Sequence, residues 1–127
     1  MTFADVRQQI ADLIRNDAEW TTYAYPPQVP LPMSVVLVPD DPYIVSTNGK
    51  SSLLATIRMR VCIYLPSLDN QGNLEQLERI ATIVRRSIQD ATQNIGDLSG
   101  PVVEMYENGY LLTAHMPFET LAEWSTT

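Results

Sequence analysis

The chain has 127 residues, of which 45% are hydrophobic and 18% are charged, and its formal net charge is −7 at pH 7. This composition excludes a disordered chain and predicts one domain, residues 1–127, that buries its own hydrophobic core. The acidic balance disfavours general electrostatic attraction to nucleic acid or to an anionic membrane.

The sequence also gives an expectation for the cellular compartment of the protein. It has no long apolar run and no basic-then-apolar amino terminus, so we expect neither a membrane span nor a secretory signal. The one cysteine, Cys62, cannot form an internal disulfide, which is typical of a reducing compartment. We expect a soluble protein, made in the cytosol, that folds without metal, disulfide or cofactor.

The first predicted element is a helix over residues 2–17. Thr2 is placed to cap it, with Asp5 three residues on in the capping-box position. The apolar positions share one face and are Phe3, Val6, Ile10, Leu13 and Ile14.

An extended connector and a short strand are expected next. Residues 20–32 contain four prolines, which cannot lie inside a helix or a central strand. The apolar run 33–38 predicts a strand, and we expect a break at residues 39–42. Residues 46–52, with the sequence STNGKSS, predict an exposed loop.

The clearest pattern in the chain is a two-residue alternation over residues 52–66, which predicts a long central strand with one buried face. The buried face is predicted to hold Ala55, Ile57, Met59, Val61 and Ile63. The wetter face is predicted to hold Thr56, Arg58, Arg60, Cys62 and Tyr64.

A second helix is predicted to follow a turn at residues 67–72, with Asn73 as its cap and Gly96 marking its exit. Residues 101–106 and 110–118 predict a hairpin around the Asn108-Gly109 turn. The element order is therefore helix, strand, long strand, helix, hairpin. It predicts an α+β fold, a two-layer sandwich in which a mainly antiparallel sheet packs against two helices.

Few residues suggest catalysis. Asn48-Gly49-Lys50-Ser51 ends like a phosphate-binding loop, but the pattern requires a glycine where Ile44 stands and a helix directly after it. We interpret it as an exposed loop.

Cys62 and His115 are the only thiol and the only imidazole, so a catalytic pair would need them to meet on neighbouring strands. A packing role is the commoner reading of such residues. One histidine and one cysteine do not make a recognisable zinc site. Asp40 and Asp41 lie between two prolines and are interpreted as a turn, not as an acid-base pair.

Arg58 and Arg60 fall on one face of the long strand. Either they lie in solvent or they meet carboxylates of another chain. The sequence pattern leaves both alternatives open.

The order and lengths of the elements, and their pattern of polar and apolar residues, resemble those of tail terminator proteins, also called tail completion proteins, of long-tailed bacteriophages. The similar stretches begin with the amino-terminal helix. They continue through VVLVPDDPYIV, STNGKSS, ATIRMRVCIYL, LEQLERIATIVRRSI and YLLTAHMPFE.

The resemblance implies a structural virion protein of the tail and neck, assembled in the host cytoplasm and without enzymatic activity. Its subunits would form a homo-oligomeric ring, typically a hexamer, that caps the tail tube, stops tube growth and docks to the head-closure or neck protein. DNA would pass through the ring without specific binding.

A closed ring needs two unlike patches on each subunit. In such a ring, Arg58 and Arg60 are candidates to face acids of a neighbour such as Asp40, Asp41 or Glu107. The loop that would reach the tube or the next subunit comprises Ser46, Thr47, Asn48, Gly49, Lys50 and Ser51. The alternatives are another connector component, a head-closure or adaptor protein, or a solitary cytosolic binding module.

Overall fold

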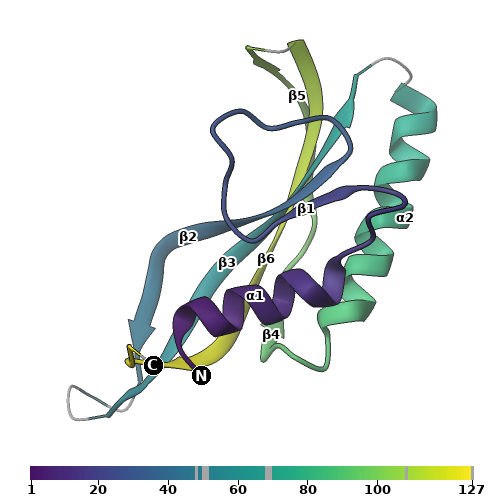
Figure 1. The fold of residues 1–127 in the computed structure, drawn as a ribbon. Coiled ribbons are helices and arrows are strands. Elements are labelled where there is room, and N and C mark those ends of the chain that lie inside the picture. Colours follow the sequence, from purple (N-terminus) through teal and green to yellow (C-terminus); the bar gives the residue numbers. More distant parts are fainter. Residues whose placement is uncertain (48, 50–51, 68–69, 108, 127) are drawn as a thin grey trace.

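The chain folds into a six-stranded sheet with two helices on one of its faces, as Figure 1 shows. The structure is a computed structural model that describes residues 1–127 except 48, 50–51, 68–69, 108 and 127. The elements are α1 (Phe3–Ile14), β1 (Thr21–Tyr23), β2 (Ser34–Ser46), β3 (Leu54–Pro66), α2 (Asn70–Ile88), β4 (Asn94–Ile95), β5 (Ser99–Tyr106) and β6 (Gly109–Glu123). The predicted α+β sandwich is confirmed.

Strand β3 is the centre of the sheet, because β2 and β6 flank it on its two sides. The strand order is β1-β2-β3-β6-β4. Strand β5 pairs with the same edge of β6 as β4, but with the first half of β6, whereas β4 pairs with Phe118 and Glu119. All pairs are antiparallel except β1 with β2, which run parallel over three residues. The chain termini meet at one end of the sheet, where the Glu123 N–H donates to the Met1 carbonyl at 3.0 Å.

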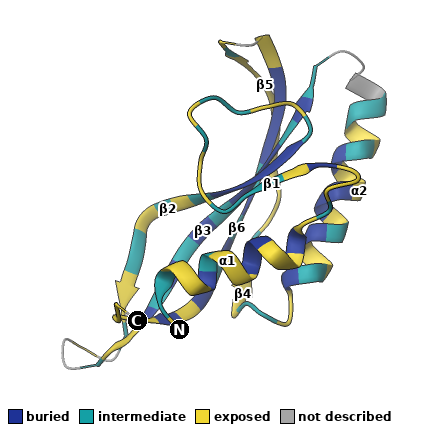
Figure 2. Ribbon diagram, viewed as in Figure 1, coloured by how far each residue is buried: buried dark blue, intermediate teal, exposed yellow. Residues whose placement is uncertain are grey.

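The alternation predicted for the long strand is confirmed, except at Cys62, which is predicted on the wetter face and is buried. Its predicted apolar residues are buried on the face toward the helices, with Leu65 continuing the row. Figure 2 shows buried residues along the middle of β3 and β6 and on the facing sides of both helices. The largest side chains that fill this layer are Phe118, Ile10, Ile14, Leu37, Ile57, Met59, Ile63, Leu65, Leu77, Ile80, Ile88 and Met116.

Helix α1 begins with the predicted capping box, since Thr2 Oγ1 accepts from the Asp5 N–H and Asp5 accepts from the Thr2 N–H. It ends at Ile14, three residues before the predicted end. There the Trp20 indole N–H donates to the Ile14 carbonyl at 3.0 Å, which satisfies an otherwise open helix terminus. The predicted stripe is wrong at Leu13, which is 42% exposed.

Both predicted ends of the second helix are wrong. Helix α2 begins at Asn70, and Asn73 lies inside its first turn, donating its side-chain amide to the Pro66 carbonyl. The helix ends at Ile88, and the residues that follow form β4. Gly96 therefore follows a strand and does not mark the exit of the helix.

The break predicted at residues 39–42 is a bulge within one continuous strand, β2. Pro39 pairs with Met59 and Ile44 with Ile57, so four residues of β2 lie opposite Arg58 alone. Two prolines in this segment remove ladder donors, which explains why regular pairing is lost here. Of the predicted hairpin turn, Asn108 lies outside the described residues, and Gly109 has the positive φ (113°) that favours glycine.

Candidate functional site

The face of the sheet opposite the helices, called here the outer face, carries the polar residues singled out from the sequence. Arg58, Arg60, Cys62 and Tyr64 alternate with the buried row of β3. The register places Glu119, Pro117, His115 and Thr113 of β6 directly opposite them. The outer face is therefore a ladder of four cross-strand pairs.

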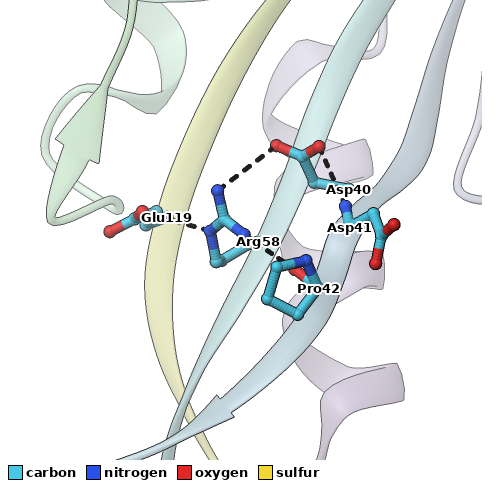
Figure 3. A network of polar contacts seen from close by, with 5 residues as sticks. All are labelled: Asp40, Asp41, Pro42, Arg58 and Glu119. Atoms are coloured by element: carbon cyan, nitrogen blue, oxygen red, sulfur yellow. Dashed lines mark hydrogen bonds and ion pairs between the residues drawn. The ribbon is translucent and has the colours of Figure 1, made fainter.

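Arg58 is held entirely within its own chain, as Figure 3 shows. Its Nε lies 3.4 Å from Glu119 Oε1, its Nη2 lies 3.8 Å from Asp40 Oδ2, and its Nη1 donates to the Pro42 carbonyl at 3.0 Å. The β2 bulge makes this possible, because it folds Asp40 and Pro42 around the guanidinium. These contacts are intramolecular, unlike the contact to a neighbour's Asp40 expected from the sequence.

The other two acids named from the sequence are free of such contacts. Asp41 is exposed and directs its carboxylate away from Arg58 in Figure 3. Glu107 is exposed between β5 and β6. Among the described residues, neither forms an ion pair.

Arg60 lies two residues along the same face and lacks the intramolecular acceptors that Arg58 has. Its Nε is buried and has no hydrogen-bond partner, and no ion pair within the described part of the chain includes it. Its cross-strand neighbours are Val38 and Pro117, whose side chains offer no acceptor. The register therefore explains the difference between the two arginines.

Arg60 lines a hollow of about 200 Å³ on the outer face, which is named here the Arg60 hollow. Four strands contribute to it, and its lining includes a guanidinium, a carboxylate, hydroxyl groups and an imidazole. The lining residues are Val38, Arg60, Cys62, Tyr64, Glu104, Tyr106, Thr113, Ala114 and His115. Such a hollow can receive a small polar group.

Two tyrosines form one wall of the hollow. The rings of Tyr64 and Tyr106 meet edge to face, with centroids 6.0 Å apart, and the Tyr106 hydroxyl donates to Glu104 Oε2 at 2.5 Å. Burial raises the pKa of Tyr64 to about 12, with a smaller contribution from Cys62. Both phenols therefore remain protonated donors at neutral pH.

Cys62 and His115 are directly opposite each other in the β3–β6 register. Burial raises the pKa of the Cys62 thiol, although the Arg60 charge opposes this. A catalytic cysteine requires the reverse shift, because the thiolate is the nucleophile. The juxtaposition fits cross-strand packing better than covalent catalysis.

The loop predicted to contact a partner leaves the sheet at the end where the termini meet. Ser46 and Gly49 are exposed, and Thr47 is tied to Leu54 by its N–H and its hydroxyl, both donating to the Leu54 carbonyl. Asn48, Lys50 and Ser51 lie outside the described residues.

Sequence reasoning missed two groups of exposed apolar side chains. The hairpin patch is Val103, Met105 and Tyr110, which are 50% to 72% exposed. Met105 pairs with Tyr110, and Val103 pairs with the buried Leu112, so the patch continues the helix-side face of the sheet. In Figure 1 this hairpin extends beyond the helices, which therefore do not cover it.

The terminal patch lies at the other end of the long strands and comprises Val45, Leu54 and Leu121. All three are 39% to 44% exposed. Val45 and Leu121 flank Thr56 in the register, so they share the outer face with Arg58. The signal for both patches was available in the sequence, as apolar positions near the strand ends, but only the extent of the helices shows that they stay uncovered.

The comparisons with known proteins add no identification: no protein-family model and no curated protein matches this chain. Within the described residues, no helix combines the length and apolarity needed to cross a membrane. The same residues contain no cluster of three or more histidine, cysteine, aspartate or glutamate side chains suited to a metal ion.

Proposed function

We propose that this chain is the tail terminator subunit of a long-tailed bacteriophage, and that it closes into a ring on the end of the tail tube. The ring ends tube growth and presents its other side to the head-closure or neck protein. The resemblance in element order is the starting point for this proposal, and the distribution of exposed surface supports it.

The observation that carries the proposal is the placement of the two apolar patches. The hairpin patch lies on the helix side of the sheet and the terminal patch lies on the outer side. They are at opposite ends of β3, whose 13 residues extend about 40 Å at ~3.3 Å per residue.

Two unlike patches on opposite faces suit head-to-tail contacts, in which the hairpin of one copy lies on the outer face of the next. Such a heterologous contact generates a closed ring when its rotation closes. Edge strand β5 adds a row of unpaired backbone groups beside the hairpin patch, because β6 is its only strand partner among the described residues. A ring would cover surface that a monomer leaves exposed.

The first test is native mass spectrometry over a concentration series, with negative-stain images of the same samples. We expect a closed ring, and we expect Met105→Lys to lower its population at least tenfold by placing a charge in the hairpin patch. The matched control is Leu13→Lys, since Leu13 is an exposed apolar residue of α1 outside both patches. Equal assembly of the two variants would contradict the role of the hairpin patch.

The second test adds tubes assembled from a tube protein encoded by a neighbouring gene. A terminator is expected to bind only at tube ends and to stop elongation, whereas a head-closure or adaptor protein leaves elongation unchanged. A protein that is monomeric at every concentration and does not bind tube ends would overturn the proposal.

A further inference from the structure

We propose that the Arg60 hollow is a receptor for one carboxylate side chain of a neighbouring copy, and that Glu107 of the β5–β6 turn supplies it. This inference rests on the ring proposed above and names a contact within it. Nothing in the composition of the hollow requires a cofactor or a metal.

The first step is the absence of an intramolecular partner for Arg60 among the described residues. Arg58 has three acceptors within its own chain, whereas the buried Nε of Arg60 has none. A buried N–H without an acceptor costs free energy, and the cost is larger when the group is charged. A carboxylate from outside the chain would pair with the guanidinium charge through the hollow that Arg60 lines.

The second step is size. The hollow measures about 200 Å³. Pockets for drug-sized ligands and cofactors are usually about 300–1,000 Å³. The Arg60 hollow therefore fits the end of a single side chain and not a whole cofactor.

The third step is charge selectivity. The Arg60 guanidinium offers donors, whereas the Thr113 hydroxyl already donates to the Val102 carbonyl at 3.3 Å and the Tyr64 hydroxyl is bonded to Cys62. The hollow also contains the carboxylate of Glu104. Glu104 accepts from the Tyr106 hydroxyl, and no ion pair of the described residues joins it to Arg60. Its negative charge opposes any entering anion, and it opposes a dianion such as phosphate more strongly than a monoanionic carboxylate.

The fourth step is the source. The chain has 15 acidic and 8 basic residues, so most charged groups that a second copy presents are carboxylates. Glu107 is exposed, forms no ion pair within the described residues, and lies next to the hairpin patch. A hairpin that rests on the outer face of the next copy brings this carboxylate to the face that bears Arg60.

The assembly test compares Arg60→Gln and Glu107→Gln with the controls Arg86→Gln and Glu75→Gln, which change exposed residues of α2. We expect each test variant to raise the dissociation concentration of the ring about tenfold or more, and the double variant to add little, because the two residues share one contact. The exchange of charges in Arg60→Glu with Glu107→Arg should restore part of the loss. Wild-type assembly of both single variants would overturn the inference and leave the ring proposal standing.

A second measurement keeps the two proposals separable. The NMR signal of the Arg60 Nε–H group is followed in dilute, unassembled protein as acetate or inorganic phosphate is added. We expect a saturable shift with acetate and a weaker one with phosphate, and no response to acetate would overturn the receptor role even if rings form. If acetate binds but no ring is ever found, the ring proposal fails, and with it Glu107 as the occupant.

Discussion

Gly96 and Pro117 approach so closely that a Cβ added at Gly96 would lie 2.6 Å from Pro117 Cγ. The Gly96 N–H donates to the Pro117 carbonyl at 2.8 Å, and the Gly96 carbonyl accepts from Arg85 Nη1 at 2.7 Å. These contacts attach the segment after β4 to β6 and α2.

We therefore predict that Gly96→Ala destabilises the fold by about 1–3 kcal/mol, the usual cost of overpacking. The measurement is chemical denaturation of the variant and of Asp97→Ala, which changes the exposed next residue. Equal midpoints for the two variants would contradict the close approach.

Arg58→Ala is predicted to destabilise the monomer by about 1–2 kcal/mol, because it leaves Asp40, Glu119 and the Pro42 carbonyl without their shared partner. The loss should shrink at high salt, since the network is partly exposed. Denaturant titrations at low and high salt measure both effects, with Arg86→Ala as the control.

The same variant tests whether Arg58 and Arg60 have different roles in assembly. Because the partners of Arg58 are in its own chain, Arg58→Ala should assemble almost normally at a temperature where it is folded. Loss of assembly in folded Arg58→Ala would show that this residue also contacts a neighbour.

The alternation of β3 was readable from the sequence because burial on one face imposes a two-residue period. Ala55 to Val61 show it without interruption, whereas Cys62 on the other face is buried as well. The capping box at Thr2 was readable for a similar reason, since it depends only on residues three positions apart.

What the sequence left unresolved depends on contacts between distant segments. Asn73 has the composition of a cap, but the end of β3 at Pro66 places its side chain against a strand carbonyl instead. Arg58 and Arg60 look alike in sequence, and the register with β6 together with the β2 bulge distinguishes them. The uncovered hairpin patch likewise depends on where the helices end in space.

The Cys62 thiol is predicted to react slowly with a disulfide reagent in the native protein at neutral pH. Burial raises its pKa, so little thiolate is present. The reaction rate should rise with pH and should rise sharply when denaturant unfolds the chain. Fast native reaction at neutral pH would contradict this environment and reopen a role for the Cys62 and His115 pair.

The raised pKa of Tyr64 leads us to predict a loss of stability at alkaline pH. Burial disfavours its phenolate, which raises the pKa of Tyr64 from its ordinary value of 10.0 to about 12 in the folded chain. The unfolded chain therefore loses this proton first. The contribution of the phenol to stability is fully present below pH 10 and is lost as pH rises toward about 12.

Denaturation midpoints measured between neutral pH and pH 12 test this sign, with Tyr64→Phe as the comparison because it keeps the ring and removes the proton. The variant should lose stability less steeply than the wild type above pH 10, while the exposed Tyr25→Phe should follow the wild type. Identical slopes for wild type and Tyr64→Phe would mean that the Tyr64 hydroxyl is solvated in the folded chain and would contradict its burial.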